Sequence, residues 1–465
     1  MKTFSLTYKT YNYEKSMHLW FSALMICAAV EVFVGCADNS IYEPKEQAQK
    51  REQYKEKLSH EVTQDEAREN LEKIITKLNI PSTRGGDTNS MPPITSVYTR
   101  GKAAVATRAG EEIEPYFHIF NFGDNEGFAI MSGDDRVEPL LALTFKGELT
   151  PETEIDNPGF EIAYSRMEDY YVNKVSSRGL TPTFPEIPPK DSIPDPILTT
   201  DTIEHYITFG YCPVKWDQNA PYNKRCTIEK VSNGIIIRDT VPTPVGCAAV
   251  AVAQLMAIYK YPNDYLYIFS NETGTFNWND MTSQYPSESG IDQIANLMYL
   301  LGKPNNLGVV YRPYPKETDS IKISSGSNPE RVPIAISNFG YTNGGKLIDY
   351  NEEQVVSELS NGYPILLRGS TVDSLGHIWL AHGLKEIITT LSYYHLSQGW
   401  ITGPPISSYY ILCNWGWKGK QDGYYLSNVF NTIEGPVFSD PDNSIETEGI
   451  YNFQTNIQAY INIRK

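Results

Sequence analysis

The most constraining feature of the chain is a long uncharged segment near its middle. Residues 240–259 contain no charged side chain, and from 248 to 259 every residue except Gln254 is apolar. A helix with so little polar surface has no face to turn toward water, so it has to lie inside a folded core. Pro244 and Gly246 form a turn signal directly before it. The segment therefore predicts a buried helix that begins close to residue 247.

Cys247 occupies the first turn of this predicted helix. One interpretation is a packed core thiol, which is the usual state of a free cysteine. The other is a nucleophile, because the positive N-terminal end of a helix stabilises a thiolate. The segment by itself favours the packed thiol, so the choice depends on what the rest of the chain supplies.

The size and charge of the chain limit its organisation and its partners. With 465 residues it is longer than one typical domain, which predicts two folded units joined by linkers. The net charge of −17 argues against binding to nucleic acid or to an anionic membrane surface. Neither a paired histidine–carboxylate spacing nor a Cys-x-x-Cys pair is present, so we expect no metal and no cofactor.

Residues 1–35 have the features of an export signal. Basic residues precede an apolar run over 18–35, which is followed by Cys36. A permanent membrane span is an alternative, but Glu31 would be costly in a bilayer. The letters FVGC that end at Cys36 resemble a lipobox, although Phe33 stands where leucine is usual. We expect a bacterial lipoprotein, lipidated at Cys36 and held at the envelope or cell surface by that anchor alone, with ordinary secretion or release after processing as alternatives.

Four cysteines follow this signal, which is too few for a disulfide framework. Cys212 and Cys226 could pair across a short loop, and the sequence leaves this open. Cys413 lies in an apolar, strand-like run and is expected to be an inert core residue.

The N-terminal half divides into a polar tether over 36–60 and a small α+β unit over 61–178. Thr63 and Glu66 form a capping box at the start of an amphipathic helix. Short β-type runs separated by turns follow, and a second helix is expected over about 159–174.

Residues 179–202 form a proline-rich hinge. The stretch contains six prolines and shows no helical or strand period, so we expect it to be extended and accessible to proteases. Trp20 is the only tryptophan before the hinge, and the other six follow it. Residues 203–465 therefore form a second, larger unit with its own core.

A thiol nucleophile requires a base, a group that orients the base, and donors for the oxyanion. In the larger unit, His377 and His382 stand five residues apart, so strand alternation would point them to opposite faces, and only one can meet the cysteine. Asn414 could accept a hydrogen bond from the imidazole, and Trp415 and Trp417 would shield that bond from water. The alternative is a satisfied core histidine and a strand that ends in a tryptophan-rich turn.

Several sequence blocks occur together in the larger unit. They are WDQNAPYN (216–223), the cysteine helix (243–262), RVPIAISNFGY (331–341), EQVVSELSNGYPILLRG (353–369), GHIWLAHG (376–383) and NWGWKGKQDGYYLSNVF (414–430). As an ordered set they resemble streptopain and its relatives, a family of secreted bacterial cysteine peptidases. The resemblance implies an α+β fold: a papain-like domain with a helical and a β-rich subdomain over 203–465, after a small α+β pro-domain over 61–178.

The resemblance also implies roles for single residues. Cys247 would be the nucleophile, His377 the base, Asn414 its orienter and Gln218 an oxyanion donor, with two tryptophans, Trp415 and Trp417, beside them. It implies an exported endopeptidase that acts on protein or peptide substrates and is made as a latent zymogen. Its own pro-domain would be the inhibitor, and maturation would cut the hinge.

Two departures from the family pattern concern specificity. His382 stands where the family often has an acidic residue, and 384–410 is longer than expected, so we expect a loop there that overhangs the cleft. Two rival functions remain open, namely a peptidoglycan-cleaving Cys–His hydrolase and a non-catalytic surface lipoprotein that kept the fold for binding.

Overall fold

The fold is seen in a computed structural model. The description begins at residue 60, after the predicted N-terminal signal and almost all of the predicted tether. The structure describes residues 60–78, 91–103, 113–177, 192–193, 202–204, 212–232, 235–267, 272–315, 321–370, 376–395, 399–431 and 457–465. The predicted signal, the lipidation site Cys36 and most of the tether therefore lie outside the described residues. Within these ranges, no helix combines the length and apolar character needed to cross a membrane.

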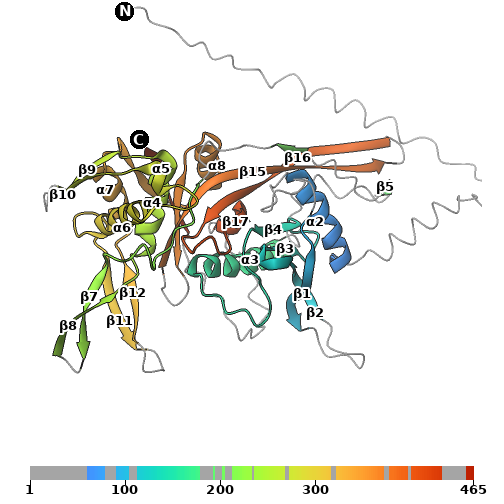
Figure 1. Ribbon diagram of the computed structural model, residues 1–465. Helices are drawn as coiled ribbons and strands as arrows, with labels where there is room; N and C mark the ends of the chain where they lie inside the picture. The colour runs from blue at the N-terminus through green and yellow to red at the C-terminus, as the bar shows by residue number, and fades with distance from the viewer. Residues whose placement is uncertain are drawn as a thin grey trace, which may run out of the picture. The chain divides into compact units, whose positions relative to one another are not determined.

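One large antiparallel sheet organises the described chain (Figure 1). Its main path, in spatial order, is β1 (Ile94–Ala103), β2 (Ile113–Phe122), β3 (Phe128–Ser132), β4 (Leu140–Thr144), β17 (Gly423–Leu426), β16 (Gly399–Asn414), β15 (Gly376–His395), β14 (Ile365–Ser370), β18 (Gln458–Arg464) and β13 (Asn343–Asp349). Strands from the predicted pro-domain and from the predicted peptidase domain thus share one sheet. Three separate two-stranded hairpins are β7 (Thr227–Ser232) with β8 (Ile235–Pro242), β9 (Asp264–Tyr267) with β10 (Glu272–Thr275), and β11 (Val310–Pro315) with β12 (Ile321–Gly326).

The N-terminal part is the predicted small α+β unit, with the helices α2 (Gln64–Leu78) and α3 (Pro158–Ser177) and the short 3-10 turn η1 (Gly123–Asn125) beside β1 to β4. The predicted capping box is present, since the Thr63 N–H donates to Glu66 Oε2 at 3.0 Å and the Glu66 N–H donates to Thr63 Oγ1 at 3.3 Å. This reciprocal pair satisfies free donors at the start of α2. Apolar residues of both helices belong to the core that lines the sheet.

The larger part combines helices with the other half of the sheet. Its helices are α4 (Cys247–Tyr259), α5 (Trp278–Met281), α6 (Glu288–Gly302), α7 (Arg331–Asn338) and α8 (Glu352–Ser360), with the 3-10 turn η2 (Ser427–Phe430). As predicted, α4 is buried, and it packs with α6, α7 and residues of β14 and β15 in a second core. The predicted α+β class, with a helical and a β-rich part after a small α+β unit, is confirmed.

The two halves of the sheet meet where β4 pairs with β17 (Figure 1). Gly423 lies opposite Thr144, and a Cβ atom at this glycine would stand 2.2 Å from the Leu143 carbonyl oxygen. Any side chain there would force the strands apart. The glycine therefore permits the close approach that joins the sheets.

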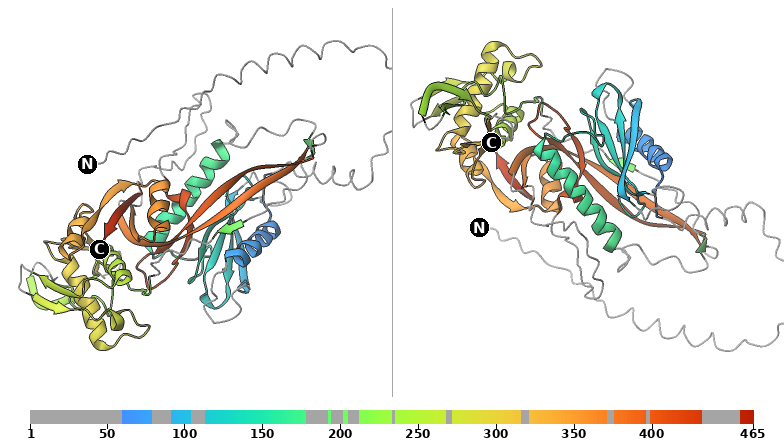
Figure 2. Two further views of the ribbon diagram at one scale, coloured as in Figure 1. Left: turned by 90° about the horizontal axis from the view of Figure 1, so that it is seen from above. Right: turned by 90° about the horizontal axis from the view of Figure 1, so that it is seen from below.

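The segment 384–410 differs from the predicted loop. Almost all of it belongs to β15 and β16, which pair over most of their length and run far beyond β14 (Figures 1 and 2). The prediction of an overhanging loop is wrong, because the extra residues form a ladder of backbone hydrogen bonds with each other.

Two short strands lie in the predicted hinge and at its end. They are β5 (Ser192–Ile193) and β6 (Thr202–Glu204), which pair with β15 at its far end and near its middle. Strand backbone is extended, as predicted for this stretch, but its pairing with β15 was not predicted. A lone two- or three-residue strand has no periodicity to detect, since only its partner strand defines it.

Candidate active site

Cys247 is the first residue of α4, as the sequence predicted. Gly246 precedes it with φ of 98°, a conformation that favours glycine, and its carbonyl accepts the N–H groups of Ala249 and Val250. The N–H of Val245 donates to the backbone carbonyl of Gln218 at 2.9 Å. This turn therefore holds the thiol at the positive end of a buried helix.

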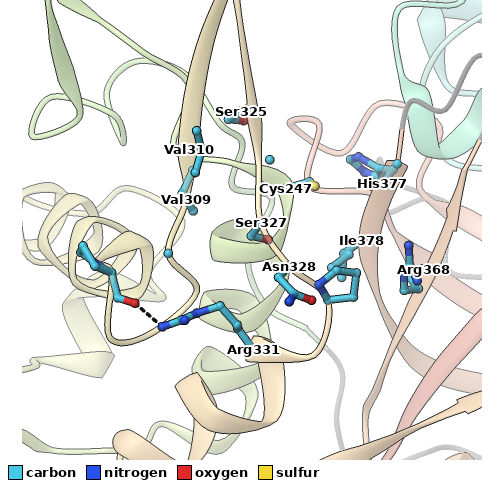
Figure 3. A pocket seen from close by; sticks show the side chains of 15 residues that line it. Cys247, Val309, Val310, Ser325, Ser327, Asn328, Arg331, Arg368, His377 and Ile378 are labelled. Carbon is cyan, nitrogen blue, oxygen red and sulfur yellow. Dashed lines mark hydrogen bonds between the residues drawn. The ribbon is translucent and has the colours of Figure 1, made fainter.

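A cleft of about 890 Å³ opens beside the thiol. In Figure 3 residues of β14 and β15 lie on one side and residues of the β11–β12 hairpin on the other. The lining residues are Cys247, Pro304, Gly308, Val309, Val310, Ser325, Gly326, Ser327, Asn328, Pro329, Arg331, Arg368, Gly376, His377 and Ile378. This volume is within the range of pockets that hold small ligands, so it could take a few residues of a peptide.

His377 lies at the start of β15, opposite Gly369 of β14, and is buried. Its Nε2 is 2.9 Å from the backbone carbonyl oxygen of Trp415, which holds the ring and leaves Nδ1 for the thiol. Burial by itself would raise the pKa of Cys247. The hydrogen bond and the charge of His377, with backbone hydrogen bonds from Ile378 of β15 and from Ala248 of α4, outweigh burial and lower this pKa. The cysteine and the histidine therefore form a close pair in which the thiolate is stabilised.

Asn414 is not placed as the sequence predicted. Its Nδ2 donates to the carbonyl of Val214 at 2.9 Å, and its Oδ1 accepts the N–H of Gly416 at 3.0 Å. The prediction that Asn414 orients the imidazole is therefore wrong in this structure. The amide fixes the loop on either side of Trp415, and the Trp415 carbonyl takes the orienting role.

Asp422 is a site residue that sequence reasoning missed. Its Oδ1 accepts a hydrogen bond from the backbone N–H of Trp415 at 3.0 Å. This buried carboxylate therefore fixes the backbone of Trp415, whose carbonyl bonds His377. Burial raises the pKa of Asp422 to about 7, against the opposite effects of the Trp415 N–H and of Lys215. A lone acid in the block NWGWKGKQDGYY was the available signal.

The two predicted shielding tryptophans both lie near the imidazole. The Trp417 ring stands edge-on to His377 with centroids 6.2 Å apart, and the Trp415 ring is fully buried. Trp379 also stacks on His377 at 6.3 Å, from two residues along β15. Aromatic rings therefore surround the imidazole, and Trp379 joins the predicted pair.

The remaining candidate residues take separate places. Gln218 is buried in the turn whose backbone contacts Val245. The ring of His382 accepts the N–H of Cys212 at its Nδ1, at 3.1 Å, and His377 is the histidine that bonds Cys247. Cys212 and Cys226 are both free thiols, so the disulfide that the sequence left open does not form.

One group of side chains among the described residues has the composition of a metal site. His60, Asp134 and Asp135 could direct three ligand atoms to one point. However, Arg136 bonds both oxygens of Asp134, and His60 bonds Asp135 at 2.7 Å. These atoms are already paired within the α+β unit.

The start of α3 lies against the active site. A Cβ atom at Gly159 would stand 2.4 Å from Cε3 of Trp415 and 2.8 Å from Cδ2 of His377. Asn157 caps this helix with its Oδ1, while its Nδ2 donates to the carbonyl of Lys420 at 3.1 Å. The α+β unit therefore contacts the imidazole itself.

Comparison with known proteins agrees with this arrangement. Residues 216–425 match the sequence model of the Peptidase C10 family, and residues 59–171 match that of the Spi protease inhibitor. Streptopain of Streptococcus pyogenes serotype M28 (strain MGAS6180) is 26% identical over 356 residues, which are 69% of this chain and 76% of streptopain. The thiol protease/hemagglutinin PrtT of Porphyromonas gingivalis is 23% identical over 350 residues, which are 70% of this chain and 35% of PrtT.

One solved structure is also similar. A prointerpain A fragment of Prevotella intermedia covers 80% of this chain and 99% of the fragment, with 21% identity and a TM-score of 0.45. The family matches have the predicted order, with the inhibitor model ahead of the peptidase model, so the chain is a cysteine-type peptidase that is similar to streptopain and carries an inhibitor-like propeptide domain.

Proposed function

We propose that this protein is an exported cysteine endopeptidase, made as a latent zymogen, in which Cys247 is the nucleophile and His377 the general acid–base. The observation that carries the proposal is the lowered pKa of a thiol that shares a cleft with a buried, anchored imidazole. Perturbed nucleophiles of this kind gather at active sites.

The reaction follows from the pair. The Cys247 thiolate attacks the carbonyl carbon of a peptide bond and forms a C–S bond. As the C–N bond breaks, His377 gives its proton to the leaving amine. Water, deprotonated by the same imidazole, then attacks the thioester, which releases a carboxylic acid and restores the thiol.

Donors for the oxyanion come from the start of α4 in this proposal. The backbone N–H of Cys247 and the side chain of Gln218 are the candidates, and the contact between Val245 and Gln218 supports their closeness. One such donor contributes about 3 kcal/mol to transition-state stabilisation.

Latency is assigned to the α+β unit. The close approach of Gly159 to His377 and Trp415 supports a pro-domain that sits on the catalytic residues and excludes substrate. Maturation would cut within 179–202, and the paired strands β5 and β6 would restrict the cut to the residues between and before them.

The location is part of the same proposal. The basic and apolar N-terminal segment with FVGC before residue 37 supports export and lipidation at Cys36. Metabolic labelling with a fatty-acid analogue, lost in Cys36→Ser, tests this independently of the chemistry.

The central experiment uses purified full-length protein and its Cys247→Ala variant. We expect the native chain to process itself, to cleave casein afterwards and to react with an epoxide thiol inhibitor, and the variant to do none of these. Purified peptidoglycan is the second substrate. Release of muropeptides without casein cleavage would show that the chain is a cell-wall hydrolase and contradict the proposal.

Latency is tested in the same full-length chain with Gly159→Ala. The added methyl group has to push α3 away from Trp415 and His377, so inhibitor labelling before processing should become about 10- to 100-fold faster. Gly123→Ala is the matched control, because its Cβ would meet only a Thr95 methyl at 3.2 Å and proline atoms, in the same α+β unit. Equal labelling in both variants would contradict the inhibitory contact.

A further inference from the structure

We propose that Arg368 selects substrates that carry a carboxylate, by binding an acidic side chain of the peptide in the cleft. This inference rests on the proposed peptidase function and adds a specificity residue to it. No sequence motif marks Arg368 as functional, and its role follows from its position on β14.

Arg368 stands next to the catalytic strand. In the β14–β15 ladder it lies opposite Ile378, and the adjoining pair is Gly369 with His377. Residues directly opposite in a sheet point to the same face, and both Arg368 and Ile378 line the cleft. Figure 3 shows Arg368 on the same side as His377. A peptide bound at Cys247 would therefore pass within reach of this guanidinium.

The guanidinium is held by a neutral group. Arg368 Nη1 donates to Gln458 Oε1 at 2.6 Å, and Gln458 Nε2 donates to Asp349 Oδ1 at 3.0 Å. The second bond fixes which end of the amide faces the arginine. Because the Gln458 amide carries no charge, this contact orients Arg368 without neutralising its positive charge. The guanidinium group still has N–H donors that can bind a ligand.

The cleft has the charge that a carboxylate needs. Among the described residues that line it, two are arginines and none is acidic, although the whole chain has a net charge of −17. No ion pair joins Arg368 to a carboxylate of the described residues. An unpaired positive field within a cleft attracts ligands of opposite sign.

Arg331, the second arginine, has a different role. Its Nε donates to the carbonyl of Asn306 at 2.7 Å, and one of its Nη atoms donates to the carbonyl of Pro304. These bonds use its donors to hold the loop after α6. It adds positive potential, but Arg368 is the arginine that is oriented by a side chain and free to form a forked bond with substrate.

The test uses processed enzyme and peptide pairs that differ only by Glu or Gln at one position on either side of the cut. We expect native enzyme to prefer Glu at one position, by roughly 10- to 100-fold in kcat/KM, the size of a charged hydrogen bond. Arg368→Gln should bring this ratio close to one, and Arg368→Lys should keep part of it. Higher salt should reduce the native ratio.

A second arm separates two sources of the carboxylate. Peptides with a free or an amidated C-terminus compare the terminal carboxylate with the side chain, and a preference for the free terminus alone would overturn the side-chain assignment. Arg225→Gln is the matched control, since Arg225 also bonds a neutral amide oxygen, that of Asn296, but does not line the cleft. We expect this control to keep the native Glu/Gln ratio.

The outcomes distinguish this inference from the function on which it rests. No cleavage and no thiol labelling would overturn both. Cleavage with a native Glu/Gln ratio near one, or with an unchanged ratio in Arg368→Gln, would overturn only the role of Arg368. Asp373 lies in 371–375, outside the described residues. A Glu preference that appears only in Asp373→Asn would also overturn the role of Arg368, because the Asp373 carboxylate would then bind the guanidinium in the native chain.

Discussion

Cys247 and Cys413 are two cysteines of the same unit whose surroundings shift their pKa values in opposite directions. Cys413 lies in a buried stretch of β16, where burial raises its pKa well above 9.0 despite the opposing effect of the Trp379 side chain. At Cys247 burial acts in the same direction, but His377 and the backbone N–H groups of Ile378 and Ala248 reverse the result. Burial makes a thiol inert, and only a nearby cation and aligned donors make it reactive.

Two regions of the structure contribute to the active site in different ways. The start of α4 stabilises charge on sulfur, whereas the end of β16 and the loop after it supply rigid geometry. Asn414, Trp415 and Asp422 form linked hydrogen bonds that end on the imidazole. One region sets the reactivity of the thiol, and the other sets the position of its base.

Removal of the imidazole should raise the pKa of Cys247, so that both Cys247 and Cys413 become unreactive thiols. In His377→Ala the pKa of Cys247 should rise, because burial is no longer opposed, and peptide cleavage should fall by roughly 10³-fold or more. Iodoacetamide labelling of mature enzyme from pH 5 to 9 measures this, with the half-maximal pH moving upward. An unchanged labelling profile would show that the helix alone lowers the pKa.

Asp422→Asn should change how stability depends on pH. The carboxyl has a pKa of about 7 in the folded chain and 3.8 as a free group, so the folded state holds the extra proton between these values. Native stability should therefore fall as pH rises from about 4 to about 7, by an amount on the order of a few kcal/mol, and the variant should lack this slope. Denaturant unfolding of both proteins at several pH values tests the sign, and parallel curves would contradict it.

Asn414→Ala distinguishes the two possible orienters of the imidazole. Because Asn414 bonds Val214 and Gly416 instead of His377, its loss should loosen the loop and reduce kcat by about 10-fold, the value of one hydrogen bond. The pH profile of thiol labelling should stay unchanged. A loss as large as that in His377→Ala would restore the amide as direct orienter.

The smallest effect is expected at the inert cysteine. Cys413→Ala removes one buried sulfur and should destabilise the fold by about 1 kcal/mol, with native cleavage and native labelling retained. Thermal unfolding and kcat/KM of mature enzyme measure the two effects. Lost labelling in this variant would mean that the reagent had been reporting on the wrong thiol.

Local pattern predicted much of the fold correctly. The capping box at Thr63 and the buried helix at Cys247 depend on residues close in sequence, so local pattern and helical periodicity define them. The prediction of a loop over 384–410 was wrong, because the two arms of that segment pair with each other as β15 and β16. The partner of the short strands β5 and β6 lies far away in the sequence, so only the folded chain shows that pairing.

By itself, the sequence determined which residue types were available for thiol chemistry and which segment had to be buried, since composition and periodicity act locally. Only the tertiary structure decided their partners. In the folded chain the imidazole bonds a backbone carbonyl in place of the expected amide, and Asp422 bonds the residue that carries this carbonyl. Gly159 lies against the imidazole, and Arg368 lines the cleft. Hydrogen bonds between distant segments depend on how sheets and helices pack, and that packing is a property of the whole chain.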